Sequence, residues 1–387
     1  MQVGVGFSVK EDYLQTTQEA VNSAYSSLGK QTADLAILFT TKEFNHPLAL
    51  KSILKTLGEI PLLGASSTEI ICAKGPINKG IVLLLFSFPE KTYFNTSCVE
   101  EVNKNNALSM GRNLGEKLLY GCKGNRRNLN LIFSSCLGPE GQNIFLGLQE
   151  RVGKSFPIIS ASLQDGIYFN NASLNHSVSG VLFGGKLLFG LGVKHGWRPL
   201  GKPRKVTLSS NNAIIEIDGK PAASLYKDYL DKDNAGIKKE LKRISKYYPI
   251  GIDITGKKEY LLRSLSDIET NNTLIFNGNI PKGSEIQLMI SSKESCLQST
   301  REAAELAKDA LKGQKIKLLL ILNSSARLSL LGIKAAEEIE IIKEVCGKDT
   351  PIAGIYTNAE YAPLNNAGLL GVSYFYNNSI VILTMTG

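Results

Sequence analysis

Acidic and hydroxyl-bearing residues recur at matching places along this 387-residue chain. Three times, a proline opens an apolar run that ends in small polar or aromatic residues, and a carboxylate follows that proline by eight or nine positions: Glu69, Asp165 and Glu360. A carboxylate can pair with an ammonium group, while hydroxyl and amide groups can orient a polar ligand. The combination would suit a small zwitterion such as an amino acid. At any one of these positions, an acidic residue in a solvated loop is the simpler explanation.

The other candidate residues come from the predicted ends of strands. In open α/β sheets, ligands bind outside the carboxyl ends of the strands. Arg327 could hold a ligand carboxylate with its planar guanidinium, but a structural ion pair with Glu337 or Glu338 explains it equally well. Hydroxyl groups after a strand also commonly cap the next helix. The predicted ligand-binding set is Ser66, Ser67, Glu69, Ser134, Ser135, Asp165, Ser325, Arg327, Tyr356, Thr357, Asn358 and Glu360.

An enzymatic interpretation needs a nucleophile and a base. Cys136 is the best nucleophile candidate, because it follows a predicted strand and precedes a predicted helix, whose N-terminus would lower the pKa of a thiol. Its base would have to be His176 or His195, and nothing in the spacing supports either. A packed, unreactive thiol is the alternative for Cys136.

We predict neither a metal nor a cofactor. The six cysteines show no CxxC pairing or zinc-finger spacing, and the three histidines are scattered. Gly4 and Gly6 begin a GxG pattern, but the third glycine and the later acidic residue of a dinucleotide-binding motif are missing. We expect the cysteines to be reduced.

The net charge of +9 could attract nucleic acid or an anionic membrane. However, the basic clusters at 126–127, 202–205 and 238–246 lack the interleaved aromatic residues of nucleic-acid-binding surfaces, so we do not expect nucleic acid as a partner. No apolar run approaches the roughly 20 residues that span a bilayer. The N-terminus also lacks the pattern of a secretory signal. We therefore expect a cytoplasmic protein without membrane insertion.

The elements that must position these residues form a pattern that occurs three times. Each copy contains an apolar run, an amphipathic segment of helix length and a second apolar run, at residues 35–67, 129–162 and 316–358. This order is typical of a β–α–β unit, and proline suits the start of a strand. A further strand and helix precede each unit, and another strand follows. The pattern thus predicts three related β–α–β–α–β units that start near residues 3, 92 and 284.

Residues 196–283 have no counterpart in the other copies. We predict that they begin with a hairpin between 206–208 and 213–217, and that the domain junction lies between residues 220 and 235. Two further hairpins are expected, within 176–193 and within 371–385, turning at Gly-Gly-Lys and at Asn-Asn. The predicted fold class is α/β: a two-domain protein with mixed β-sheets flanked by helices.

Three segments carry a family resemblance. Residues 327–363 contain the pattern Arg…Leu-Gly…Glu-Glu…Pro-x-x-Gly-x-Tyr-x-x-x-Glu-x-x-Pro, residues 61–70 read PLLGASSTEI, and residues 192–230 run from GVKHGW to KDYL. These segments resemble the FIST family, named for F-box and intracellular signal transduction proteins. The resemblance covers nearly the whole chain. It implies an N-terminal domain of residues 1–224 and a C-terminal domain of residues 225–387.

The family is regarded as a sensory, small-ligand-binding module of signal transduction, with amino acids as proposed ligands, and it is not known as a catalytic family. The resemblance thus implies a sensor that binds an amino acid or a similar small polar molecule and passes the signal to a separate protein. The chain departs from the family pattern by a missing glycine before Glu69, a serine at 324 or 325 in place of a cysteine, and Asn358-Ala359 before Glu360. These departures could alter or abolish ligand binding. The alternatives are an enzyme that acts on an amino-acid-like or peptide-like substrate through Cys136 or a serine, and a scaffold without a ligand.

Overall fold

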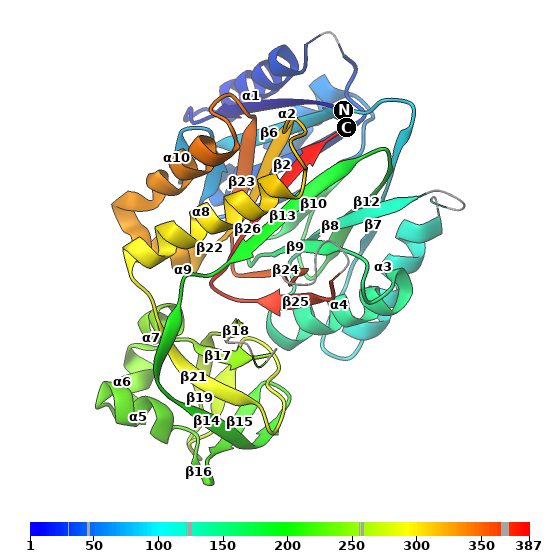
Figure 1. The fold of residues 1–387 in the computed structure, drawn as a ribbon. Coiled ribbons are helices and arrows are strands. Elements are labelled where there is room, and N and C mark those ends of the chain that lie inside the picture. The colour runs from blue at the N-terminus through cyan, green and yellow to red at the C-terminus, as the bar shows by residue number, and fades with distance from the viewer. Residues whose placement is uncertain are drawn as a thin grey trace.

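The computed structural model describes residues 1–29, 31–44, 47–120, 122, 126–254, 256, 259–364 and 371–387. Three six-stranded sheets surround a common apolar core, and an eight-stranded sheet lies to one side of them (Figure 1). Helices cover the outer faces of the sheets. The predicted fold class, mixed β-sheets flanked by helices in an α/β protein, is confirmed.

Each six-stranded sheet combines four strands of one repeat with a hairpin from another repeat. The first sheet has the order β1 (Gln2–Ser8), β6 (Ile81–Ser87), β2 (Leu35–Thr41), β3 (Leu62–Ser67), β10 (Ile167–Phe169) and β11 (Ala172–Leu174). The second has the order β25 (Ser373–Tyr376), β24 (Ala359–Pro363), β9 (Ile158–Ser162), β8 (Arg127–Ser134), β12 (Val178–Gly185) and β7 (Thr92–Val99). The third has the order β13 (Leu188–Lys194), β26 (Ile380–Thr386), β22 (Leu318–Ser324), β23 (Ile352–Thr357), β4 (Ile70–Cys72) and β5 (Gly75–Ile77).

The three predicted β–α–β units are present. The strand pairs β2–β3, β8–β9 and β22–β23 are parallel, as a helical crossover between them requires. The crossovers contain η1 (Lys42–Phe44) with α2 (Pro47–Leu57), α4 (Gly138–Val152), and α9 (Ser325–Leu331) with η2 (Gly332–Lys334) and α10 (Ala335–Cys346). The helices that precede the units are α1 (Tyr13–Leu28), α3 (Ala107–Tyr120) and α8 (Lys293–Asp309).

The predicted start of the third repeat near residue 284 is wrong. The edge strands β1 and β7 pair antiparallel with the closing strands β6 and β12, and the strand that pairs with β26 in the same way is β13. The strand β21 (Glu285–Ile290) instead pairs with β14 (Arg198–Ser210) and β17 (Ile250–Asp253) in the eight-stranded sheet. The third repeat therefore begins at Leu188, is interrupted, and resumes at α8.

Two predicted hairpins are also wrong. β12 pairs with β7 and β8 whereas β13 pairs with β26, so the Gly-Gly-Lys segment carries the chain from one sheet to another. In the same way, β25 pairs with β24, and β26 belongs to the third sheet. Turn residues show where the chain changes direction, but they do not decide which strand becomes the hydrogen-bonding partner.

Residues 195–291 interrupt the third repeat and form a compact unit, here called the insert. Its predicted β14–β15 hairpin is confirmed, with Val206 opposite Ile217. Its own apolar core includes Val206, Tyr226 and Phe276. The domain boundary expected after residue 224 falls inside the insert, at the start of α5, and remains a prediction. The remaining elements of the insert are β15 (Ala213–Ile217), β16 (Lys220–Pro221), α5 (Ser224–Leu230), α6 (Asn234–Lys239), α7 (Leu241–Tyr247), β18 (Tyr260–Arg263), β19 (Leu265–Ile268) and β20 (Leu274–Phe276).

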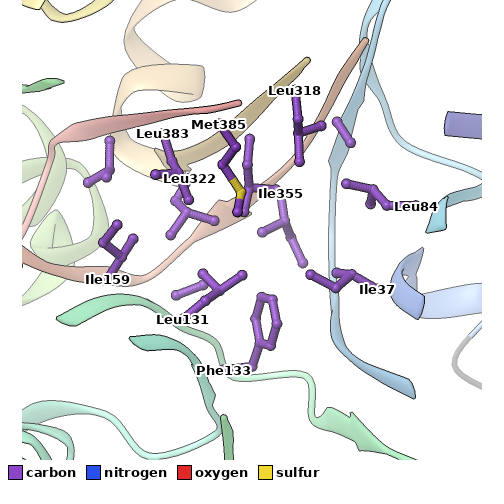
Figure 2. Close-up of a cluster of buried hydrophobic side chains, with 14 of the residues drawn as sticks. Ile37, Leu84, Leu131, Phe133, Ile159, Leu318, Leu322, Ile355, Leu383 and Met385 are labelled. Atoms are coloured by element: carbon purple, nitrogen blue, oxygen red, sulfur yellow. The ribbon is translucent and has the colours of Figure 1, made fainter. Parts of the chain in front are cut away.

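Apolar side chains fill the space between the three six-stranded sheets. Ile37 and Leu84 come from the first sheet, Leu131 and Phe133 from the second, and Leu383 from the third (Figure 2). The rings of Phe39 and Phe133 meet across two sheets, with centroids 5.7 Å apart. A binding site at the centre of this body is therefore excluded, and any site must lie at its ends or against the insert. Among the described residues, no helix has the length and apolar character needed to cross a membrane.

Candidate functional site

The tips of the parallel strands meet at one end of the three-sheet body, as the strand pattern predicts. Three backbone hydrogen bonds link the repeats in a ring: Ser66 N to Gly166 O, Tyr356 N to Glu69 O, and Asn358 N to Ser162 O, at 3.1, 3.2 and 2.9 Å. A salt bridge of 2.8 Å from Lys42 Nζ to Asp165 also joins the first repeat to the second. The end of the second parallel strand of each repeat, β3, β9 or β23, is thus held by a neighbouring repeat.

The three recurring carboxylates do not occupy equivalent places. Glu360 lies opposite Ala161 in the second sheet. The equivalent position is occupied by Ile167, opposite Ala65, in the first sheet, and by Ile70, opposite Ile355, in the third. Glu69 and Asp165 precede those isoleucines, in partly exposed links. Because Glu360 has no exposed surface, the prediction that it faces a ligand beside the other two carboxylates is wrong.

Glu360 is held inside the protein by local hydrogen bonds. Thr357 Oγ1 donates to Glu360 Oε1, and the backbone N–H of Ser379 donates to Oε2 at 3.3 Å. Burial raises the pKa of Glu360 to about 8, and these hydrogen bonds only partly oppose the shift. The side chain is therefore mostly protonated at neutral pH.

Arg327 forms the structural ion pair that was the alternative to a ligand role. Its partner is Glu338, whose Oε1 lies 2.6 Å from Arg327 Nη2, and both side chains are fully buried. Asn323 Nδ2 donates to the second carboxylate oxygen at 2.7 Å. The guanidinium also donates to three groups on α8, Cys296 O, Ser299 Oγ and Thr300 Oγ1, at 2.9, 2.9 and 2.7 Å. It further donates to His195 O, just after β13, at 2.7 Å. Arg327 thus joins α9 to α8 and α10.

Most of the predicted hydroxyl groups bond locally. Ser67 Oγ donates to Tyr356 O at 2.7 Å, and Thr357 Oγ1 donates to Asn323 O at 3.2 Å. Ser134 Oγ accepts from Cys136 N at 3.1 Å, and Ser135 Oγ accepts from Ser177 N at 2.9 Å. Ser66 and Tyr356 are buried. The four bonded hydroxyl groups thus serve the fold, whereas Tyr356 Oη is buried without a hydrogen-bond partner among the described residues.

Three predicted residues, Ser135, Ser325 and Asn358, line open space. They belong to two cavities of about 1090 and 270 Å³ that share Leu137 and Gln164 in their walls. We call this space the strand-tip cleft. The body and the insert both contribute walls, including Glu140, His176, Lys246, Ser264, Asn279 and Asn377.

The link between β25 and β26 ties the body to the insert along this cleft. Ser264 Oγ donates to Asn378 Oδ1 at 2.9 Å, and Asn378 Nδ2 donates to Lys246 O at 3.0 Å. Ser264 N donates to Asn377 Oδ1 at 3.3 Å. The prediction of a hairpin turn at Asn377-Asn378 did not reveal this role. The available signal was the two amides just before a buried strand, where polar side chains are uncommon.

Two amide groups in the cleft walls are buried without a partner. Within the described residues, neither Asn377 Nδ2 nor Asn279 Oδ1 has a hydrogen-bond partner. Asn377 is only 1% exposed. A buried donor or acceptor that stays unpaired costs about 1–3 kcal/mol. The residues that line the cleft therefore include one unpaired donor and one unpaired acceptor.

Cys136 lacks the properties of an activated nucleophile. The thiol is 2% exposed and packs in the apolar cluster with Ile144 and Phe145. Burial raises its pKa to about 12, so the thiol stays protonated at neutral pH. Cys136 is therefore a packed, unreactive thiol, as in the alternative interpretation of the sequence. Across the part of the chain that the structure describes, no three His, Cys, Asp or Glu residues gather in a geometry that could hold a metal ion.

Family models account for most of the chain. The model of the FIST N domain matches residues 34–220, and the model of the FIST C domain matches residues 222–363. The chain belongs to the FIST family. The predicted family is confirmed with both of its domains, and FIST domains are associated with sensing in signal transduction.

Individual relatives of this FIST protein are distant. An uncharacterized protein of Methanocaldococcus jannaschii is 32% identical over 157 residues, which span 37% of this chain and 29% of that protein. Similar solved structures include cyanuric acid hydrolase from A. caulinodans, with a TM-score of 0.39 and 7% identity over 99% of this chain and 98% of that one. A chorismatase has a TM-score of 0.36 and 8% identity, over 100% of both chains.

Proposed function

We propose that this FIST protein is a sensor that binds a small polar molecule in the strand-tip cleft and passes the signal to a separate signalling protein. The family association supports the sensory role. The observation that carries the site is the unpaired, buried Nδ2 group of Asn377 in the wall of the cleft. A buried donor without a partner costs free energy, and a hydrogen bond to a ligand oxygen would remove that cost.

An amino acid or a similar zwitterion is the proposed ligand class. Its carboxylate would accept from Asn377 Nδ2, near the ammonium group of Lys246, which also lines the smaller cavity. Its ammonium group would donate to Asn279 Oδ1, with the carboxylate of Glu140 in the same wall. This arrangement places an unpaired donor and an unpaired acceptor toward the two charged groups of one small molecule.

The position of the cleft supports a signalling role. Its walls come from the body and from the insert, so a ligand that bonds to both would favour the arrangement in which they are closest. A ligand shifts a conformational equilibrium only through such differential contacts. The insert would then present a different surface to the partner protein when the cleft is occupied.

A thermal-shift screen with a panel of free amino acids tests the proposal. At least one should raise the melting temperature of the wild-type protein, because a ligand that binds only the native state stabilises it. Asn377→Asp keeps the oxygen that accepts from Ser264 but replaces the unpaired donor with a repelling charge, so the shift should disappear. Asn22→Asp makes the same change on the exposed face of α1 and should leave the shift intact. A panel without effect, or an unchanged shift in Asn377→Asp, would overturn the proposal.

A further inference from the structure

A second cavity lies where β13 leads into the insert. Its volume is about 490 Å³, and three aromatic residues line it: Trp197, Tyr260 and Tyr376. The body contributes the first turns of α8 with Ser295 and Ser299. We call it the aromatic cavity. None of the twelve residues predicted from sequence lines it.

Two polar atoms in its walls are buried and unpaired. Within the part of the chain that the structure describes, Glu259 Oε2 and Tyr376 Oη have no hydrogen-bond partner. Tyr376 is 4% exposed, and burial raises the pKa of its hydroxyl further above the usual range, so that it remains an O–H group. Glu259 as a whole is partly exposed, but this one oxygen is buried, and a buried oxygen without a partner is unfavourable. It becomes favourable when a cation pairs with it.

Among the described residues, the other charged side chains that line the cavity do not neutralise Glu259. Burial lowers the pKa of His195 to about 4, and its Nδ1 accepts from Trp197 N at 2.9 Å, so this imidazole is neutral. Lys194 lies 3.7 Å from Glu302 and is paired there. Arg198 is exposed at the rim. Arg263, whose buried guanidinium lies near Tyr376, does not line the cavity and donates to Leu262 O and Phe375 O. Among the described residues that line the cavity, Glu259 is thus an acidic group without a charged partner.

The aromatic residues add to the attraction for a cation. Indole and phenol rings attract ammonium groups through the negative charge of their faces. Tyr260 is fixed in the wall, because its hydroxyl donates to Gln287 Oε1 at 2.7 Å. Trp197 is fixed as well, since its Nε1 donates to Tyr247 O at 3.3 Å. Both rings are thus held in place before a ligand arrives.

The Arg327 ion pair supports the floor of this cavity. Arg327 Nη1 donates to His195 O at 2.7 Å and to Ser299 Oγ at 2.9 Å, and both of these residues line the cavity. The guanidinium is itself fully buried, and both of its terminal nitrogens donate to protein groups. It acts on the cavity through its neighbours, as a positioning residue.

We infer that the aromatic cavity is a second ligand site, separate from the strand-tip cleft, and that it takes a small organic molecule with a primary ammonium group. The ammonium group donates to Glu259 and to Tyr376 Oη, and the aliphatic part of the molecule packs against Trp197 and Tyr260. This site goes beyond the proposed function, because it uses none of the residues that carry the strand-tip cleft.

Isothermal titration with n-butylamine and 1,4-diaminobutane tests the site, with 1-butanol as the neutral probe of similar size. The amines should bind the wild-type protein saturably with one site, whereas the alcohol should not bind. Glu259→Gln should weaken amine binding by about tenfold or more, since it removes the charge that pairs with the ammonium group. Tyr376→Phe should weaken it by a smaller factor. Glu90→Gln, the same change on an exposed carboxylate in the link between β6 and β7, should leave binding unchanged.

Failure of this site is distinguishable from failure of the proposed function. Asn377→Asp should retain amine binding, and Glu259→Gln should retain the thermal shift produced by the ligand of the strand-tip cleft. Circular dichroism spectra of each variant establish that it is folded before its titration is interpreted. Absence of amine binding by the wild-type protein would overturn the inference. Equal binding by the wild type, Glu259→Gln and Glu90→Gln would do so as well.

Discussion

Glu360 is the residue at which the three repeats differ most in chemistry. It occupies a buried strand position that isoleucine fills in the other two sheets. A spacing of eight or nine residues from a proline could not reveal this, because a shift of one residue along a strand reverses the face to which a side chain points. The sequence placed Glu360 at the correct strand tip. Its burial depends on strand register, which the sequence pattern leaves undetermined.

The raised pKa of Glu360 predicts a particular dependence of stability on pH. The folded protein retains a proton up to about pH 8, whereas an ordinary carboxyl group releases it near the reference pKa of 4.5. The free energy of unfolding should therefore fall as the pH rises from about 4.5 to about 8. In Glu360→Gln this contribution is absent, so the variant should gain stability relative to the wild type across that interval.

Urea unfolding at several pH values between 5 and 8 measures this difference. Glu305→Gln, on the exposed face of α8, serves as the control and should follow the wild type. A stability difference between Glu360→Gln and the wild type that stays constant with pH would contradict the prediction.

The buried pair of Arg327 and Glu338 gives a second prediction at this scale. Arg327→Ala should destabilise the protein by about 3–5 kcal/mol, because it leaves the Glu338 carboxylate buried without its charged partner. The double variant Arg327→Met, Glu338→Leu removes both charges and should recover part of the loss. Chemical unfolding of the three proteins makes the comparison. If the double variant were less stable than Arg327→Ala, the ion pair would not explain the loss.

At the scale of elements, alternating glycines mark two of the edge strands that pack against helices, β1 and β13. A Cβ atom on Gly4 or Gly6 would lie 2.1 or 2.0 Å from a carbonyl oxygen of α1, and on Gly190 or Gly192 it would lie 1.9 or 1.8 Å from one of α8. The helix backbone thus occupies the place of a side chain. The GxG pattern at the N-terminus has this packing role, in place of the dinucleotide site that we considered. The same spacing in β13 was the available signal for the true start of the third repeat.

This close approach predicts that Gly192→Ala is poorly tolerated. Its methyl group would collide with Ala303 O, and a collision with backbone forces the helix or the strand to shift. We expect a loss of about 1–3 kcal/mol or more. Gly236→Ala is the matched control, since its nearest neighbour is a side-chain oxygen of Asp233 at 3.1 Å. Thermal melting of both variants checks the prediction, which fails if the two lose equally little.

The β–α–β units could be predicted because their signals are local. An apolar run, an amphipathic helix and a proline-led strand lie within about 40 residues of one another, as in 316–358. Strand partners could not be predicted, because β10 pairs with β3 from another repeat and β24 pairs with β9. The strand-tip location of the site followed from general topology. The contribution of Asn279 and Lys246 to the cleft could not be predicted from topology, because the insert resembles no other part of the chain.

At the scale of the whole molecule, the three repeats exchange hairpins in a cycle. The first repeat lends β4–β5 to the third sheet, the second lends β10–β11 to the first sheet, and the third lends β24–β25 to the second sheet. Each sheet therefore needs a neighbouring repeat to be complete, and an unpaired strand edge is prone to aggregation.

The exchange predicts that residues 1–224 do not fold alone. In that fragment β13 lacks β26, β4 lacks β23, and β9 lacks β24, so three sheet edges are left open. Expressed separately, the fragment should be insoluble or should melt without a cooperative transition, whereas co-expression with residues 225–387 should restore both properties. A soluble fragment 1–224 with a cooperative melting curve would contradict the prediction.

The link between β25 and β26 borders both cavities: Asn377 and Asn378 face the strand-tip cleft, while Tyr376 and Ser379 line the aromatic cavity. A molecule bound in either cavity would contact residues of this same short link. If a bound amine changes the affinity for the polar ligand by some factor, the bound polar ligand changes the affinity for the amine by the same factor. If both proposed ligands bind, this shared link would let the protein respond to the two molecules together.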